Sequence, residues 1–335
     1  MTIVQLVRRV WFVTACAVAV IAWGSVVRAT GSGAGCGGHW PTCDGAMVLL
    51  PKDTAMLVEL VHRASSGLLI LLVAWMLIGV LRTLPAGHAA KKTAVAASVV
   101  LVIEALLGAG LVLFGLVADN DSTARAVVIA VHLTNTLMLL GFLTLTAWLV
   151  PKPSVQLEGL GMLGMPLAFG LAAYVIVGAS GAVTALGDTL FPAATLREGI
   201  RQDMGTTAHF LIKMRVIHPV LASATGAYFV LLAGAIGRAR PRAVRASVAV
   251  TILVIGQVAL GLVNLALLAP IPVQVIHLLA ADLLWIALIV MCADAWLTSR
   301  GRDEAHVDRG ELVSQRRAQT ERDRICPADA AGSVS

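Results

Sequence analysis

Charged side chains are scarce in this chain of 335 residues. Asp, Glu, Lys and Arg make up 13% of it, whereas 58% of the residues are hydrophobic. Soluble domains have a charged share nearer to about 25%, so this composition excludes an ordinary soluble enzyme and a disordered protein. Cysteine is also rare: five residues are too few for a small scaffold held together by disulfides. The chain must therefore bury its apolar residues in another way.

Long apolar runs take the place of the missing charges. A helix needs about 20 mostly apolar residues to cross a bilayer, and eight runs approach or exceed that length. The first run follows Arg8 and Arg9 as a signal peptide would, but it is too long for a cleaved signal. We therefore predict an all-α integral membrane protein with eight transmembrane helices, at residues 9–29, 56–81, 93–118, 126–150, 160–184, 208–236, 246–269 and 272–297.

The distribution of positive charge predicts the orientation. If the N-terminus is cytoplasmic, most Lys and Arg residues fall in inner loops or in the polar C-terminal segment, as the positive-inside rule requires. Both termini are then cytoplasmic, and the protein is predicted to be a multi-pass protein of the cell (plasma) membrane. Residues 299–335 are rich in Arg, Asp and Glu and are predicted to form a disordered cytoplasmic tail.

The two halves of the chain resemble each other. Four predicted helices separate equivalent positions, and this even number indicates a parallel repeat about an axis along the membrane normal. We predict two pseudo-symmetric four-helix bundles, residues 1–150 and 160–298, joined by a cytoplasmic linker at 151–159. The equivalent positions include Glu104 with Gln257, Gly108 with Gly261, Gly24 with Gly178, His62 with His218, and His132 with His277.

Four histidines lie at one predicted depth, in the outer leaflet. Ionisable residues inside a membrane are costly and commonly functional. A single one could be a structural residue with an interhelical hydrogen bond, but one histidine in every second helix favours two pairs of haem ligands. Zinc is disfavoured, because no carboxylate or thiolate cluster completes a tetrahedral set. The four residues are His62, His132, His218 and His277.

The halves differ one helical turn before these histidines. Glu59 precedes His62, whereas Arg215 precedes His218. A buried carboxylate beside one ligand suggests chemistry in the first half, and an arginine suits haem propionates or redox holding in the second. The structural alternative for Glu59 is an ion pair with Arg63, and the two interpretations can coexist.

Two cysteines lie in the first predicted outer loop. Because that side of the membrane is oxidising, we predict a disulfide between Cys36 and Cys43. The alternative is a metal site that uses Cys36, His39 and Cys43, although no clear fourth ligand is present.

Over roughly residues 8–297 these features resemble haem A synthase, the membrane enzyme that converts haem O to haem A for terminal cytochrome oxidase assembly. The resemblance implies successive oxidation of the C8 methyl of haem O to a formyl group. It implies haem b as cofactor on His218 and His277, haem O near His62, His132 and Arg63, and Glu59 as the catalytic residue. The family pattern has an amide where Glu104 stands. The motifs are Val27–Gly33 with Cys36 and Cys43, Glu59–Arg63, Val131–Leu133, Arg215–Pro219 and Ala269–Leu279.

Alternative functions explain fewer residues. A bis-histidine dihaem electron carrier, such as a cytochrome b-like quinol oxidoreductase, accounts for the histidines but not for Glu59 in one half only. A transporter predicts helices broken at mid-membrane, whereas Pro219 lies near an outer end. The expected partners are haem O, the lipid bilayer, an unidentified electron donor or acceptor and, as a candidate, haem O synthase. No nucleic-acid partner is expected.

Overall fold

A computed structural model describes residues 1–46, 50–157, 159 and 161–299. The predicted tail lies outside the described residues from residue 300 onward. Within the described part, eight helices are long and apolar enough to cross a membrane, as predicted. They are α1 (Ile3–Ala29), α2 (Thr54–Thr83), α3 (Ala89–Leu113), α4 (Thr123–Leu149), α5 (Gly164–Leu190), α7 (Phe210–Ala239), α8 (Val244–Ala266) and α9 (Ile271–Trp296).

Polar side chains define where several helices begin. The Thr2 hydroxyl accepts a hydrogen bond from the Gln5 amide, and the Gln5 side chain accepts one from the Thr2 amide, which forms a capping box. Asp53 caps α2 in the same way through the amide of Met56. These caps satisfy amides that the first helical turn leaves without partners. With these caps α1 begins six residues and α2 two residues before the predicted apolar run.

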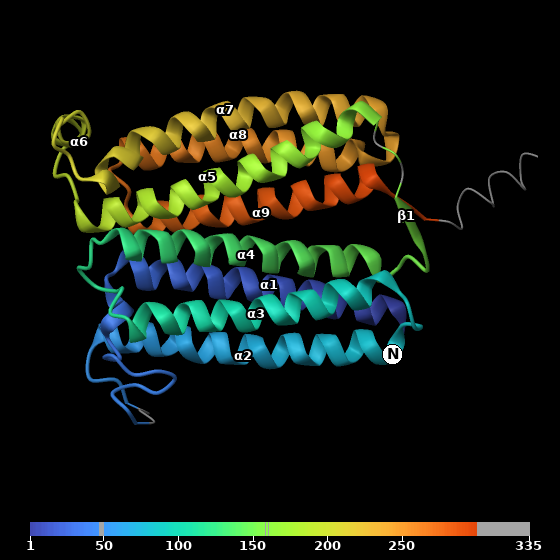
Figure 1. The fold of residues 1–335 in the computed structure, drawn as a ribbon, viewed down its shortest axis with the longest axis horizontal. Helices are drawn as coiled ribbons and strands as arrows, with labels where there is room; N and C mark the ends of the chain where they lie inside the picture. Colours follow the sequence, from blue (N-terminus) through green and yellow to red (C-terminus); the bar gives the residue numbers. More distant parts are fainter. Residues whose placement is uncertain (47–49, 158, 160, 300–335) are drawn as a thin grey trace, which may run out of the picture.

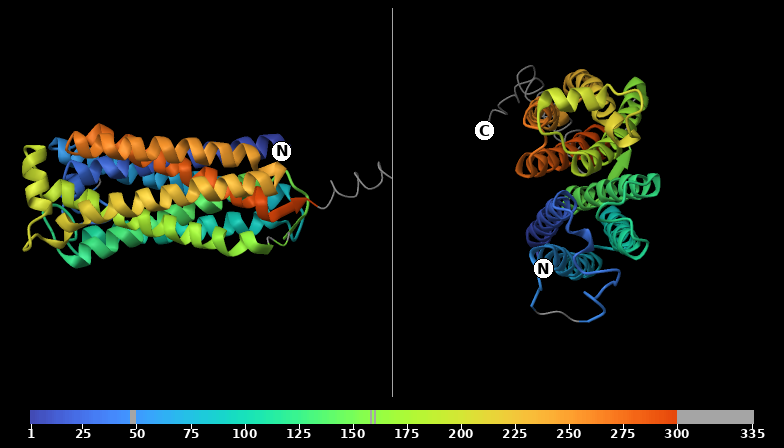
Figure 2. Two further views of the ribbon diagram at one scale, coloured as in Figure 1. Left: turned by 90° about the horizontal axis from the view of Figure 1, so that it is seen from above. Right: turned by 90° about the vertical axis from the view of Figure 1, so that its left-hand side faces the viewer.

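The helices form two groups that run side by side along the long axis of the molecule (Figure 1). Helices α1 to α4 form one group, and α5, α7, α8 and α9 form the other. At the boundary between the groups, α4 packs against both α5 and α9. The end-on view in Figure 2 separates the same groups. Trp285 of α9 donates its indole hydrogen to the Leu137 carbonyl of α4 at 2.7 Å, a buried bond across this boundary. The pseudo-symmetry and the separate tasks of the two halves stay predictions.

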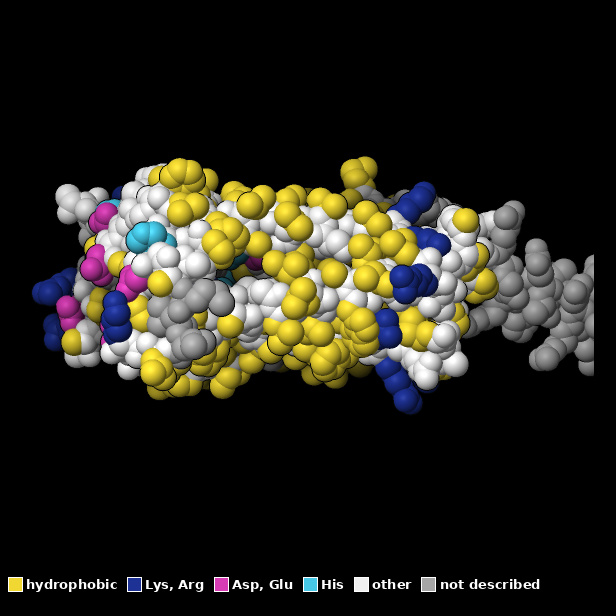
Figure 3. Space-filling model, turned by 90° about the horizontal axis from the view of Figure 1, so that it is seen from below, with side chains coloured by type: hydrophobic (Ala, Val, Ile, Leu, Met, Phe, Trp, Pro, Cys, Tyr) yellow, Lys and Arg dark blue, Asp and Glu magenta, His cyan; other side chains and the backbone are white. Residues whose placement is uncertain are grey.

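The sides of the molecule are apolar and its ends are charged. Figure 3 shows hydrophobic side chains along the middle of one face, with Lys and Arg near both ends and Asp and Glu gathered at one of them. Large apolar residues such as Leu71 and Leu231 are 67% and 74% exposed, which in water would be costly. Lipid covers such a surface in a membrane, so the fold describes a multi-pass membrane protein.

Short elements connect the long helices. At one end β1 (Val155–Leu157) pairs antiparallel with β2 (Leu297–Ser299), so the predicted linker is tied to the end of α9. At the other end α5 continues to Leu190, and α6 (Leu196–Asp203) follows in what the sequence predicted as a loop. The remaining short elements are the 3₁₀ turns η1 (Ser32–Ala34), η2 (Gly161–Leu163) and η3 (Pro241–Ala243).

Candidate haem-binding site

The structure brings the four membrane histidines together in two pairs. His62 of α2 and His132 of α4 are close enough for their charges to interact. In the other group of helices, His218 of α7 and His277 of α9 have the same relation. All four side chains are only partly exposed. Each group of helices therefore holds one pair of imidazole rings, the number of protein ligands that a six-coordinate haem requires.

Each imidazole ring lies beside a glycine of a neighbouring membrane helix. A Cβ added at three of these glycines would stand within 3.2 Å of the ring, closer than ordinary van der Waals contact. At the fourth, Gly108, the corresponding distance to the His132 ring is 3.9 Å, so contact there is ordinary. The distances from such an added Cβ to the nearest ring carbon, Cε1, are 3.0 Å at Gly24 for His62, 2.9 Å at Gly181 for His218 and 3.2 Å at Gly261 for His277.

This contact pattern corrects one repeat assignment. The sequence paired Gly24 with Gly178, but Gly178 faces Leu133 and Leu137 of α4. The glycine beside His218 is Gly181. Spacing alone misplaced it because helix faces recur every three to four residues, so a neighbouring glycine matches the repeat almost as well.

The donor atoms fit a haem better than a single bound metal ion. In the described part of the chain, Nδ1 of His62, His132 and His277 is buried without a hydrogen-bond partner, whereas Nδ1 of His218 pairs with Ser180 Oγ at 2.9 Å. Among the described residues no group of three or more His, Cys, Asp or Glu side chains could hold a metal ion. Paired histidines with small residues beside them suit a flat macrocycle held between helices.

Glu59 lies beneath the loop that joins α1 and α2. Its carboxylate is 3% exposed and accepts a hydrogen bond from the Cys36 amide at 2.8 Å. It also forms an ion pair with Arg63, with 2.5 Å between Oε1 and Nη2. The predicted ion pair is therefore confirmed, and both carboxylate oxygens have donors. The catalytic role of Glu59 stays a prediction.

Arg63 and a disulfide hold the same loop. Cys36 and Cys43 are joined, which confirms the predicted disulfide and removes both thiolates from the alternative metal site. Arg63 donates through Nη1 to the carbonyls of His39 and Thr42, each at 2.7 Å. Because Nε and Nη2 bind Glu59, most donors of this guanidinium are engaged within the protein. Substrate binding by Arg63 stays a prediction.

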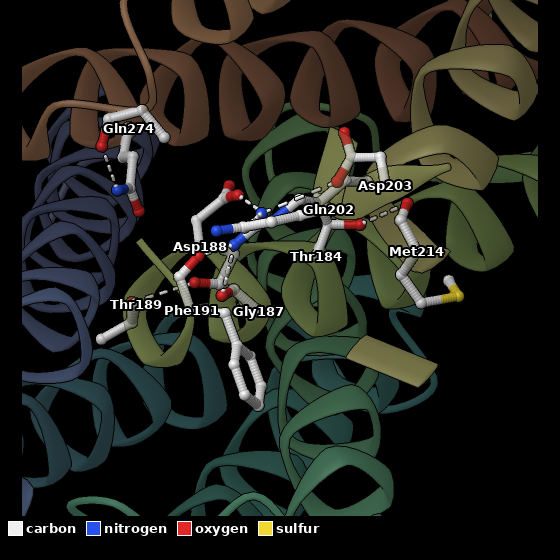
Figure 4. Close-up of polar contacts among 12 residues, drawn as sticks. Thr184, Gly187, Asp188, Thr189, Phe191, Gln202, Asp203, Met214 and Gln274 are labelled. Atoms are coloured by element: carbon white, nitrogen blue, oxygen red, sulfur yellow. Dashed lines mark hydrogen bonds and ion pairs between the residues drawn. The ribbon is translucent and has the colours of Figure 1, made fainter. Parts of the chain in front are cut away.

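Arg215 is likewise enclosed by protein groups. Its Nε lies 2.9 Å from Asp188 Oδ1 near the C-terminal end of α5, and Nη1 contacts Gln202 and Asp203 of α6. Figure 4 shows Asp188, Gln202 and Asp203 converging on one guanidinium. Burial raises the pKa of Asp203, and the positive charge of Arg215 opposes that rise. Sequence spacing placed Arg215 beside His218, but gave no signal that α6 would supply its partners.

Arg28 joins the two groups of helices. This α1 residue donates to the Ala185 carbonyl at 2.6 Å, to Thr189 Oγ1 at 2.7 Å and to Gln274 Oε1 at 2.7 Å. Gln274 is one turn before His277 on α9, and its amide also binds the Ala269 carbonyl (Figure 4). The sequence motif contained Arg28, yet its spacing did not predict contacts with the other half.

The described geometry agrees with what comparison with known proteins shows. A family model of cytochrome oxidase assembly proteins matches residues 8–289, a range that includes all four membrane histidines and Glu59. The chain belongs to this family.

The curated relatives of this chain carry two names. The chain is 42% identical over 288 residues to a Protoheme IX farnesyltransferase of Thermus thermophilus, covering 85% of this chain and 47% of the relative. It is 33% identical over 111 residues to a Heme A synthase of Staphylococcus carnosus, covering 32% and 36% of the two chains. A Heme A synthase of Staphylococcus haemolyticus is 39% identical over 93 residues, which cover 27% of this chain and 30% of the relative. The resemblance to haem A synthases is thus confirmed. The chain spans about half the length of the farnesyltransferase relatives it matches.

Proposed function

We propose that this protein is a haem A synthase that oxidises the C8 methyl of haem O to a formyl group for cytochrome oxidase assembly. The observation that carries the proposal is the asymmetry between two similar histidine pairs. Both pairs have ring-side glycines, but only the first has a buried carboxylate, Glu59, one turn before a ligand. A substrate haem and a resident haem need similar axial ligands but different neighbours.

In this proposal the second pair holds the cofactor. His218 and His277 bind haem b, which supplies electron transfer when bound. Ser180 orients His218 through Nδ1, and Gly181 and Gly261 leave room for the two rings. Arg215 holds the outer ends of α5, α6 and α7 together, so these ligands stay at fixed positions.

The first pair positions the substrate. His62 and His132 hold haem O, whose farnesyl tail lies toward lipid, and the helices keep water away from the reacting methyl. Glu59 accepts a proton from that carbon or stabilises positive charge that develops there. Arg63 places a positive charge beside this carboxylate, with 2.5 Å between its Nη2 and Oε1 of Glu59. The loop held by Arg63 covers this site on the outer side.

The proposed function also implies a location and partners in the cell. We place the protein in the cell membrane with both termini in the cytoplasm. Haem O synthase is its proposed partner, since one relative is named a Protoheme IX farnesyltransferase and others are named Heme A synthase. Conversion of the methyl to a formyl group adds one oxygen atom and removes four electrons. Oxygen from water requires an electron acceptor, whereas oxygen from O2 requires an electron donor, and in either case this partner is unidentified.

A chromatographic haem profile tests the catalytic assignment. Cells that express Glu59→Gln as their sole copy should make little haem A, accumulate haem O or a hydroxylated haem, and keep the b-type spectrum of the purified protein. The substitution preserves shape and removes charge. Glu198→Gln in α6 makes the same chemical change away from the membrane histidines and should leave haem A unchanged. Normal haem A from Glu59→Gln would remove Glu59 from the mechanism.

The second measurement separates this proposal from a dihaem electron carrier. Haem extracted from wild-type protein should include haem O or a hydroxylated product, whereas a carrier would yield only its resident haem. His218→Ala or His277→Ala should abolish the low-spin b-type spectrum. A spectrum that survives both changes would place haem b elsewhere.

A further inference from the structure

A second membrane carboxylate, Glu104, lies beside the first histidine pair. It belongs to α3 and makes three contacts with one face of α4. Oε2 accepts a hydrogen bond from Asn135 Nδ2 at 2.5 Å, and Oε1 accepts one from the hydroxyl of Thr136. The same Oε1 lies 3.3 Å from Nδ1 of His132, without in-line hydrogen-bond geometry. The carboxylate is thus held firmly next to the ring nitrogen that would face away from a bound iron.

The second half offers no such charge at the equivalent position. Gln257 of α8 is a neutral amide whose Nε2 donates to the backbone carbonyl of His277 at 3.1 Å and lies 3.4 Å from Nε2 of the His277 ring. His218 has the hydroxyl of Ser180 at Nδ1. Of the four membrane histidines in the described part of the chain, His132 alone has a carboxylate within ion-pair distance of its ring.

His132 also has the most open glycine contact of the four. The Gly108 position leaves 3.9 Å to its ring, compared with 2.9–3.2 Å at the other three glycines. Its side chain is 29% exposed. Backbone contact therefore restricts this ring least, and another group has to set its orientation.

We propose that Glu104 is the positioning residue for His132 and makes it the more electron-rich ligand of the first pair. This inference rests on the proposed function. A small rotation about χ2 turns the Nδ1 hydrogen toward Oε1, which leaves Nε2 to face the iron. Carboxylate partners of ligating histidines fix the ring and raise its basicity. Negative charge behind the ligand stabilises ferric iron, so the haem on His62 and His132 has a lower reduction potential than an amide at position 104 would give.

Redox titration of purified full-length protein, loaded with ferric haem O and followed by electron paramagnetic resonance, tests the proposal. Glu104→Gln should raise the midpoint potential of the haem on the first pair and weaken its retention about 10- to 100-fold. The midpoint potential of the haem on His218 and His277, which is identified by its loss in His277→Ala, should be unchanged.

A control separates positioning from a merely structural link between α3 and α4. Thr136→Val removes a donor to the same carboxylate without touching the ring, so it should not raise the potential. An unchanged potential and unchanged retention in Glu104→Gln would overturn the proposal, as would an equal rise in Thr136→Val. If wild-type protein binds no haem at the first pair, the proposed function itself fails. The two failures are therefore distinguishable.

Discussion

Replacing Gly181 with alanine should expel the resident haem without unfolding the protein. The added Cβ would stand 2.9 Å from Cε1, 3.3 Å from Nε2 and 3.4 Å from Nδ1 of His218. Ordinary carbon contacts lie at about 3.5–4.0 Å, so the ring must move by roughly 0.6 Å. The ring is the end of a side chain and the obstacle is not backbone, so the imidazole shifts while α5 and α7 stay in place.

The magnitude follows from the cost of overpacking. Inserting a methyl group into a packed site costs about 1–3 kcal/mol, which corresponds to a loss of about 5- to 160-fold in haem affinity when the strain is relieved on haem release. Movement of the ring also weakens the 2.9 Å contact between Ser180 Oγ and Nδ1. Both effects act on the ligand.

The assay compares matched glycine variants after purification in detergent. Gly181→Ala should show a lower haem-to-protein ratio and a reduced b-type spectrum, with the apoprotein eluting as a folded species. Gly108→Ala is the control, because its Cβ would lie 3.9 Å from the His132 ring. Full haem occupancy and an unchanged spectrum in Gly181→Ala would refute the reasoning, as would an equal loss in Gly108→Ala.

Three further predictions concern the loop, the boundary between halves and the topology. Thiol labelling of unreduced protein should not modify Cys36 or Cys43, and full labelling would contradict the disulfide. Cys36→Ser should lower the free energy of unfolding by about 2.5 kcal/mol, because the disulfide no longer closes the loop in the unfolded chain. Arg28→Gln should lower the melting temperature and perturb the haem b spectrum, because it leaves Gln274 Oε1 without its hydrogen-bond donor. An unaltered spectrum would show that this contact between the two groups of helices does not affect the haem. A reporter inserted at residue 86 should be cytoplasmic and one at residue 194 external; both on one side would exclude the eight-helix topology.

The number of membrane helices was predictable from the sequence, and so was the presence of one histidine in every second helix. Apolar runs identify membrane helices because the bilayer imposes a minimum length and admits few charges. The histidines stand out for the same reason, and Glu59 with Arg63 was predictable as a pair because residues four apart share a helix face. The cysteines could be paired because their separation is short and the loop was predicted to lie on the oxidising side.

Contacts between helices that are distant in the sequence could not be predicted from the sequence. Nothing in the sequence around Arg28 places it against Thr189, and nothing around Gly181 shows that His218 rests on it. Such contacts depend on how each helix is rotated and how far it is shifted along its neighbour, and a difference of three residues between Gly178 and Gly181 is one helical turn. The sequence by itself determined a multi-pass helical membrane fold, because lipid constrains composition residue by residue. Tertiary structure alone decided which groups surround each ligand, because packing sets those distances only after the helices have met.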